Sequence, residues 1–144
     1  MTLKERYLDT AAVMIDDGNA AVKQYEQQLD AVKACGELVE HEKQAVNEAE
    51  RLLKDRENEV LQSLLVEWAG AKTNETTRKS QLEDALKNDF MYQQLRKDVD
   101  EAKNQLATAS LNYTDAANRL SFYRHLAELK TAQTRLIAAM EGEF

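Results

Sequence analysis

The feature that most constrains this chain is a heptad spacing of apolar residues, in alternating steps of three and four, on both sides of its midpoint. In the first half the spacing is kept by Leu8, Ala11, Ile15, Gly18, Val22, Tyr25, Leu29 and Val32. In the second half it is kept without a miss by Tyr92, Leu95, Val99, Ala102, Leu106, Ala109, Tyr113, Ala116, Leu120, Tyr123 and Ala127. Such spacing holds one stripe of a helix against a partner helix. We therefore predict two long helices that pack along these stripes.

Both stripes change toward their ends. Beyond Val32 the first stripe is kept only at alternate heptad positions, by Val39, Val46, Leu53 and Val60. At the end of this half the stripe becomes wider, with Leu61, Leu64, Leu65 and Trp68. Beyond Ala127 the apolar residues lead us to expect that the second stripe rotates onto Leu126, Leu129, Leu136 and Met140. The many alanines of the second stripe predict a close approach of the two backbones, with tyrosines in the wider layers.

The composition supports helix throughout. The 144 residues include no proline and only four glycines. Alanine, leucine, glutamate, lysine and glutamine dominate, and their side chains lose little freedom in a helix. No run alternates Val, Ile, Thr and aromatic residues with a period of two, so strands are not expected. We predict an all-α fold and a single helical domain over residues 1–144.

A turn is expected near the middle of the chain. Gly70 follows the first stripe, and glycine just past a helix is a common way to end it. Thr73 and Asn74 offer N-caps for the next helix. With arm one over 3–69 and the turn over 70–73, the chain becomes a long antiparallel helical hairpin, similar to a coiled coil.

Two further breaks are open alternatives. The sequence KNDF at 87–90 could end a short connecting helix over 74–87, so that arm two covers 89–141. The sequence DDGN at 16–19 could also form a turn, although the heptad register passes through it. Because a lone hairpin buries little apolar surface, we expect several copies to self-associate into a bundle with a wider core.

Charge is unevenly distributed along the chain. The net charge is −7; residues 1–70 carry 8 basic and 15 acidic side chains, whereas residues 71–144 carry 11 of each. An acidic chain repels nucleic acid on average, so a nucleic-acid site would have to be a local basic patch. The acidic first arm would instead suit a basic protein partner.

Chemistry-bearing motifs are scarce. His41 and His125 are far apart, neither follows a glutamate by three residues, and Cys35 lacks the further ligands of a zinc site. The sequence has no phosphate loop and no nucleophile elbow. We expect no enzyme activity, no metal and no cofactor. One cysteine, no long apolar run and no signal peptide are typical of a cytoplasmic protein without a membrane partner.

The turn carries a first resemblance. Trp68-Ala69-Gly70 spells W-x-G, and in this respect the chain resembles the small type VII-secreted proteins, in which a W-x-G turn joins the two helices of a dimerising hairpin. The chain departs from that family in its greater length and in the residues four positions after Tyr113 and Tyr123, which are alanines where the family has an acidic residue.

A second resemblance spans roughly residues 40–137. The order of an acidic, alanine-rich helix, a glycine turn, an E-x-x-R-K segment and an aromatic-basic final helix is similar to that of small helical proteins that phages encode beside recombination and single-strand-annealing genes. The residues that carry it are Gly70, Thr73, Glu75, Arg78, Lys79, Tyr92, Leu95, Phe122, Tyr123 and Arg124. The resemblance implies a recombination-mediator-like accessory in the host cytoplasm, with single-stranded DNA and a recombinase or annealing protein as partners.

Basic residues near the turn and in the final helix supply the candidate nucleic-acid site. Single-stranded nucleic acid is held by basic groups along its backbone and by aromatic faces against its bases. The candidates are Lys72, Arg78, Lys79, Lys87, Arg96, Lys97, Arg119 and Arg124. Trp68 and Gly70 are interpreted as structural residues of the turn. A protein adaptor, scaffold or inhibitor that acts through its acidic surface is the alternative function, and the W-x-G dimer is a further one.

Overall fold

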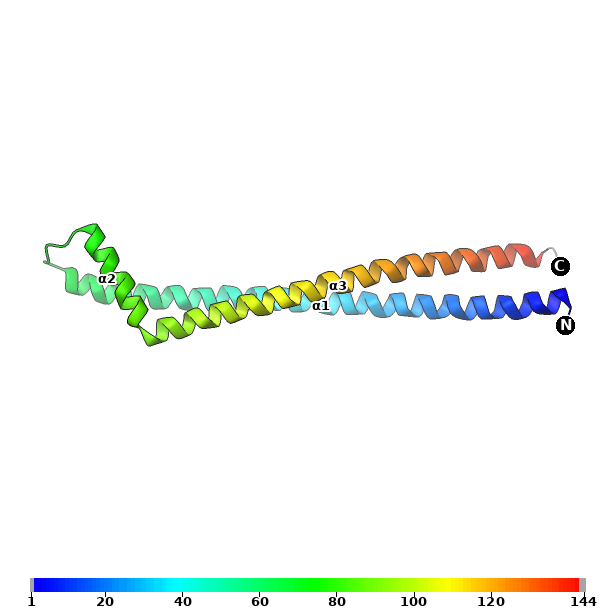
Figure 1. Ribbon diagram of the computed structural model, residues 1–144, viewed down its shortest axis with the longest axis horizontal. Helices are drawn as coiled ribbons and strands as arrows, with labels where there is room; N and C mark the ends of the chain where they lie inside the picture. Colours follow the sequence, from blue (N-terminus) through cyan, green and yellow to red (C-terminus); the bar gives the residue numbers. More distant parts are fainter. Residues whose placement is uncertain (1, 143–144) are drawn as a thin grey trace. The chain divides into compact units, whose positions relative to one another are not determined.

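The computed structural model describes residues 2–142 and contains three helices in that range (Figure 1). They are α1 (Leu3–Trp68), α2 (Glu75–Asn88) and α3 (Phe90–Glu141). The described residues include no strand, so the predicted all-α fold is confirmed. The helix bounds agree with the predicted arms to within one or two residues. The short connecting helix is present, and residues 16–19 lie inside α1 without a break.

Each helix begins at a side chain that accepts a hydrogen bond from a backbone N–H three residues later. Before α1, Thr2 Oγ1 accepts from the N–H of Glu5 at 3.2 Å, and Glu5 in turn accepts from the N–H of Thr2 at 2.7 Å. Asn74 caps α2 at 2.8 Å, and Asp89 caps α3 at 2.7 Å. These capping hydrogen bonds satisfy backbone N–H groups of the first helical turn that have no partner within the helix.

The chain forms two compact units, and both long helices contribute to each. Unit 1 joins the part of α1 up to Glu37 to the part of α3 from Ser110, and unit 2 comprises Leu38–Ala109. Within each unit α1 packs antiparallel against α3, which is the predicted hairpin arrangement. In unit 1 the start of α1 and the end of α3 lie side by side, drawn in blue and red in Figure 1.

Close backbone approach in unit 1 is visible at two glycines and one tyrosine. A Cβ on Gly18 would lie 3.7 Å from Lys130 Cβ, and a Cβ on Gly36 would lie 3.4 Å from the ring of Tyr113. Tyr7 donates a hydrogen bond from its hydroxyl to the carbonyl oxygen of Ile137 at 2.6 Å. The pairing of early residues of α1 with late residues of α3 fixes the antiparallel direction.

The seam of α1, meaning the residues that face α3, differs from the predicted stripe at every second position in unit 1. Ala11 and Gly18 are buried and Tyr25 and Val32 are half-buried, as predicted. The prediction is wrong for the four residues between them, which are 38 to 47% exposed. These are Leu8, Ile15, Val22 and Leu29. Their places are taken one residue earlier by Tyr7, Met14, Ala21 and Gln28. Only Ala21 is smaller than the residue that it replaces, so side-chain size accounts for the shift at that position alone.

The seam of α3 follows the prediction as far as Ala127. Its predicted residues are buried or half-buried, except for Tyr113, which is 41% exposed but contacts Gly36. Past Ala127 the predicted rotation is wrong. Leu129 and Leu136 are 56% and 61% exposed, and the seam continues in the same register at Lys130, Thr134 and Ile137. Leu129, Leu136 and Met140 therefore lie largely outside the core, whereas Leu126 is half-buried.

Unit 2 places α2 beside the end of α1, and α3 starts where the chain turns back along α1 (Figure 1). Its buried apolar residues are Val46, Trp68, Val99 and Ala109. Lys103 of α3 forms an ion pair with Glu50 of α1 at 3.5 Å. Trp68 is the one large side chain among these four, so the region around the turn depends on how that indole is held.

Candidate functional site

The W-x-G turn is closed by a set of side chains from α1, the turn and α2. The Trp68 indole is 8% exposed, and its Nε1–H donates to Gln81 Oε1. The guanidinium of Arg78 lies 5.6 Å from the centre of the indole ring, within the range of a cation–π contact. Arg78 Nε also donates to Thr73 Oγ1 at 2.8 Å. Arg78, one of the candidate nucleic-acid residues, is thus held by contacts from α2 to Trp68 and to the turn.

Gly70 supplies the backbone conformation of this turn. Its φ is +82°, in the left-handed region that favours glycine, and no atom lies within 4 Å of an added Cβ. The N–H of Ala71 donates to the carbonyl oxygen of Trp68 at 3.0 Å. Gly70 thus lets the chain leave α1, and its position in the turn matches its predicted structural role.

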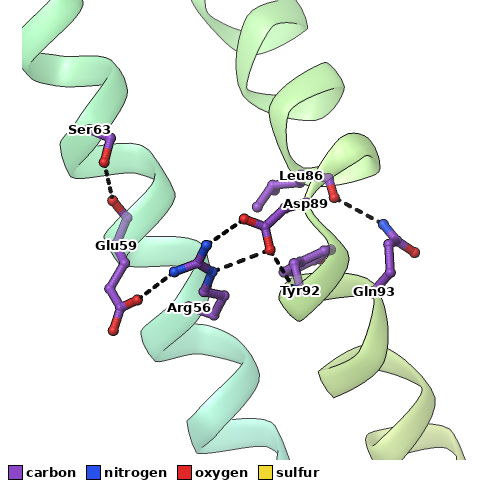
Figure 2. Close-up of polar contacts among 7 residues, drawn as sticks. All are labelled: Arg56, Glu59, Ser63, Leu86, Asp89, Tyr92 and Gln93. Carbon is purple, nitrogen blue, oxygen red and sulfur yellow. Dashed lines mark hydrogen bonds and ion pairs between the residues drawn. The ribbon is translucent and has the colours of Figure 1, made fainter.

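A second polar cluster ties α1 to the break between α2 and α3 (Figure 2). Arg56 Nη2 donates to Asp89 Oδ2 at 2.6 Å, and Arg56 Nε donates to Asp89 Oδ1 at 3.3 Å. Arg56 Nη1 also donates to Glu59 at 2.9 Å. The Asp89 side chain is 14% exposed and at the same time caps α3 through the N–H of Tyr92. The break at KNDF was predicted from the sequence, whereas the contact of Asp89 with Arg56 was not.

The electrostatics of this cluster follow from its hydrogen bonds. The guanidinium of Arg56 holds the pKa of Asp89 below its ordinary value, and the backbone N–H of Tyr92 lowers it further. The same pair raises the pKa of Arg56 above its ordinary value, chiefly through the bond to Asp89. Both members of this ion pair are held by further hydrogen bonds, Arg56 by Glu59 and Asp89 by the N–H of Tyr92. The pair therefore has a structural role and connects α1 to the start of α3.

The other basic candidates of unit 2 lie on the surface. Lys72 is in the turn, Lys79 and Lys87 are on α2, and all three are exposed. Arg96 and Lys97 are exposed in the second turn of α3. Exposed acidic residues alternate with them, since Glu83 and Asp84 lie on α2 between the two lysines. These side chains are spread over three segments, so unit 2 offers a mixed surface and not a concentrated basic patch.

Arg119 and Arg124, the two candidates of unit 1, have different surroundings. Arg119 forms an ion pair with Asp115 at 3.1 Å, one turn away on α3. Arg124 lines a shallow groove of about 420 Å³ between α1 and α3, which we call the Tyr25 groove. Its lining residues are Tyr25, Arg124, Ala127, Glu128, Thr131, Ala132 and Arg135. Two arginines and one glutamate around a tyrosine give the groove a local excess of positive charge.

An aliphatic stripe of α1 borders this groove. Val22 and Leu29 are the neighbours of Tyr25 three residues before and four residues after it, which places them beside it on the helix surface. Ile15 and Leu8 continue the line at seven-residue steps. We call these four residues the α1 stripe. The seven-residue spacing of the α1 stripe is visible in the sequence, but it led us to predict that these residues lie in the core.

The acidic residues of arm one are partly neutralised within the chain. Glu40 pairs with Lys43 at 3.1 Å, Arg51 bridges Glu48 and Asp55, and Glu50 pairs with Lys103. The hydrogen bonds from Arg51 lower the pKa of Glu48. Exposed pairs of this kind contribute little to stability. They do reduce the free negative charge that a basic partner would meet on this arm.

Metal ligands do not gather in the part of the chain that the structure describes. Among residues 2–142, no group of three or more His, Cys, Asp and Glu side chains is placed to hold a metal ion. Cys35 is half-buried. No described helix combines the length and the apolar character that crossing a membrane requires.

Comparison of the chain with protein-family models, with curated proteins and with solved structures found no match in any of the three. The two family resemblances drawn from the sequence therefore stay predictions.

Proposed function

We propose that this chain is a non-catalytic helical adaptor whose α1 stripe and Tyr25 groove bind an amphipathic helix of a protein partner. The observation that carries the proposal is the position of the α1 stripe. Leu8, Ile15, Val22 and Leu29 are 38 to 47% exposed, although their spacing is that of a packed helix face. Apolar side chains that stay partly exposed along one face of a helix are candidates for contact with another protein.

The charges of the Tyr25 groove indicate the chemistry of one flank of the partner, the flank on the α3 side of the α1 stripe. Arg124 and Arg135 line the Tyr25 groove, with Glu128 between them on α3. An arginine can bind a carboxylate through two parallel hydrogen bonds. The fitting partner is therefore a helix with leucines at heptad spacing and glutamates or aspartates along one flank of its apolar face, a helix-in-groove mode of recognition.

A titration with designed helical peptides tests this proposal. Two fluorescent peptides of identical length and leucine spacing, one flanked by glutamates and the other by lysines, would be titrated with the protein and followed by anisotropy. We expect the glutamate-flanked peptide to bind and the lysine-flanked peptide not to. The double variant Arg124→Glu, Arg135→Glu is expected to reverse this preference, because it reverses the charge of the groove.

A matched pair of variants locates the site. Val22→Glu places a charge in the α1 stripe and is expected to remove peptide binding. Val13→Glu introduces the same charge on α1 at a valine that is 60% exposed and outside the stripe, and it should leave binding unchanged. Equal loss in both variants, or equal affinity for the two peptides, would rule the proposal out.

A second candidate is the recombination accessory that binds single-stranded DNA. The observation that favours it is the aromatic-basic character of the same part of unit 1. Phe122 is 62% exposed and packs edge-to-face on Tyr123, with ring centres 5.3 Å apart, and Arg124 follows directly. Exposed aromatic rings beside arginines match the way single strands are bound through stacking and phosphate contacts.

Anisotropy of a labelled single-stranded oligonucleotide at two salt concentrations tests this candidate. Binding that weakens steeply with salt would support it, because each phosphate contact releases counterions. The double variant Arg124→Ala, Arg135→Ala should then lose binding, whereas Lys79→Ala, Lys87→Ala on α2 should retain it. No binding at low salt and high protein concentration would exclude the DNA-binding role and leave the adaptor role in place.

A further inference from the structure

In unit 1, α1 carries two apolar faces that have half of their residues in common. The shared residues are buried or half-buried against α3, and they are Ala11, Gly18, Tyr25 and Val32. The face that meets α3 in the structure, which we call the observed face, adds Tyr7, Met14, Ala21 and Gln28. The α1 stripe adds Leu8, Ile15, Val22 and Leu29 to the same shared residues, and we call this combination the alternative face. Both faces have the heptad spacing of a packed helix.

The alternative face is the more hydrophobic of the two. At the four positions that differ, it holds only aliphatic side chains, whereas the observed face includes the hydroxyl of Tyr7, the amide of Gln28 and the small Ala21. Burial of aliphatic surface is the main favourable contribution to helix pairing, and burial of a polar group offsets part of it. Hydrophobicity alone therefore favours the face that the structure leaves partly exposed.

Packing along the observed face is incomplete. An apolar groove of about 320 Å³ runs beside it, lined by Tyr7, Thr10, Ala11, Met14, Gln133, Leu136, Ile137 and Met140. The Oε1 atom of Gln133 is buried and has no hydrogen-bond partner among the described residues. Incomplete packing and a buried acceptor without a donor both cost free energy. Both defects belong to the observed face, so they bring its free energy closer to that of the alternative face.

One hydrogen bond favours the observed face. The hydroxyl of Tyr7 donates to the carbonyl oxygen of Ile137 at 2.6 Å, and Tyr7 belongs to the observed face only. Rotation of α1 about its own axis would break this bond. The shared residues Ala11 and Gly18 offer little resistance to such a rotation, because they have no large side chain that interlocks with α3. The balance between the two faces is thus a directional bond on one side and aliphatic surface on the other.

The alternative face is confined to unit 1. Seven-residue steps beyond Leu29 reach a glycine and then three charged residues, Gly36, Lys43, Glu50 and Glu57. Glu50 already forms an ion pair with Lys103 of α3. Burial of such charges against α3 would be costly, so α1 has a single face for α3 in unit 2. The sequence therefore permits the rotation in unit 1 alone.

We propose that α1 of unit 1 rotates between these two faces, so that the α1 stripe is open to a partner in one state and buried against α3 in the other. The rotation is about 50°, because the shared residues belong to both faces and adjacent residues lie about 100° apart. The observed face is the more populated one in the free chain. A helix that binds the α1 stripe stabilises the observed face further, since a ligand shifts an equilibrium toward the state that it binds. The inference rests on the proposed adaptor function for the role of the stripe, but the rotation itself is measured without a partner.

A charge placed on one face and then on the other tests the rotation. Ala21→Asp puts a carboxylate on the observed face at a residue that is 3% exposed, and Val22→Asp puts the same carboxylate in the α1 stripe. The reporter is the thiol of Ile15→Cys in a Cys35→Ala background, reacted with a thiol reagent under native conditions. Ala21→Asp should slow this reaction by at least about tenfold, because the chain turns its alternative face to α3 and buries position 15.

The matched variant Val22→Asp should leave the thiol at position 15 as reactive as in the background chain. Helical content by circular dichroism should be the same in both variants. A thiol at position 15 that stays equally reactive in the Ala21→Asp chain would overturn the proposal. Loss of helical content in that chain would also overturn it, since a chain with a second apolar face would rotate and stay folded.

Tyr7→Phe is a milder second variant. It keeps the ring and removes the hydrogen bond to Ile137, so it should raise the population of the alternative face about two- to tenfold. The thiol of Ala21→Cys should then react faster by the same factor, because position 21 leaves the core when α1 rotates. The thiol of Ala11→Cys, at a shared residue that is 4% exposed, should react as before. Equal acceleration at both positions, or none at position 21, would rule out the rotation.

Peptide binding separates this inference from the proposed function. The Ala21→Asp chain should bind the glutamate-flanked peptide at least about tenfold more weakly than the wild-type chain, because its α1 stripe is buried. A wild-type chain that does not bind the peptide, together with the expected thiol reactivities, would refute the adaptor role and retain the rotation. Peptide binding together with unchanged thiol reactivities would refute the rotation and retain the adaptor role.

Discussion

Arg56 of α1 and Asp89, the residue between α2 and α3, meet through two hydrogen bonds of 2.6 and 3.3 Å. Asp89 is at the same time the N-cap of α3, so one carboxylate sets both where α3 begins and how that start is tied to α1. The two residues are 33 positions apart in the sequence. The contact explains why the chain breaks at KNDF and continues as a separate helix.

Asp89→Asn should lower the thermal midpoint of unfolding, because the amide can still cap α3 but loses the charged pair with Arg56. The loss should depend on pH. Since the folded pKa of Asp89 lies below its ordinary value, the stabilisation is fully present above the pKa of the unfolded chain and disappears as pH falls through the folded pKa. Melting of both chains at neutral pH and under strongly acidic conditions checks this.

The control for that experiment is Asp100→Asn, which changes an exposed carboxylate on the same helix. Its melting temperature should stay close to that of the wild-type chain at both pH values. If Asp89→Asn melts like the wild-type chain at neutral pH, the Arg56 contact does not brace unit 2.

Trp68→Ala should destabilise the turn by about 3 kcal/mol, because it removes a buried indole and leaves a cavity. Trp68→Phe should cost less, since it keeps an aromatic ring under Arg78 and loses chiefly the hydrogen bond to Gln81. Chemical denaturation followed by circular dichroism gives both values. A Trp68→Ala chain as stable as the wild-type chain would show that the indole is not part of the core of unit 2.

Two glycine substitutions should have opposite effects. Gly70→Ala should destabilise by about 1 to 2 kcal/mol, because φ is +82° and a side chain resists the left-handed region. Gly18→Ala should stabilise by up to about 1 kcal/mol, because Gly18 is inside α1 and its new Cβ would make ordinary contacts at 3.5 to 3.9 Å. Denaturant titrations of the two variants give the signs. The same sign for both would contradict the placement of Gly70 in the turn or of Gly18 in the helix.

The register of the α1 seam predicts a contrast between two adjacent residues. Ala21 is 3% exposed and Val22 is 39% exposed. Ala21→Leu should overpack the seam and cost about 1 to 3 kcal/mol, whereas Val22→Leu should be nearly neutral. Unfolding free energies measured under identical conditions check this. The opposite order would mean that the predicted stripe, and not the observed seam, faces α3.

The sequence predicted the helices and the breaks because the signals for them are local. The heptad spacing, the absence of proline, Gly70 and the cap at Asp89 act within a few residues and do not depend on the partner helix. The register of the α1 seam could not be predicted in the same way. Val22 is more hydrophobic than Ala21, and Leu29 is more hydrophobic than Gln28, yet the less hydrophobic residue of each pair is the more buried one. Tertiary packing, and not local hydrophobicity, therefore decided which face of α1 meets α3.

The candidate site depended even more on tertiary contacts. Arg78 was chosen as a candidate for its charge, and its position over Trp68 follows from how α2 folds back on α1. Arg124 was chosen for its charge, and its place beside Tyr25 in a groove depends on the antiparallel pairing within unit 1. Arg135, which completes that groove, was not among the predicted site residues, although its charge and its spacing from Arg124 were visible.

Thiol accessibility of the two adjacent seam positions tests most directly the central claim that the α1 stripe lies outside the core. Ala21→Cys and Val22→Cys, each in a Cys35→Ala background, would be reacted with a thiol reagent under native conditions. The thiol at position 22 should react at least about tenfold faster than the thiol at position 21, because opening of the seam to expose position 21 costs free energy. Faster reaction at position 21, or equal rates, would place the α1 stripe in the core and contradict the binding surface proposed for this protein.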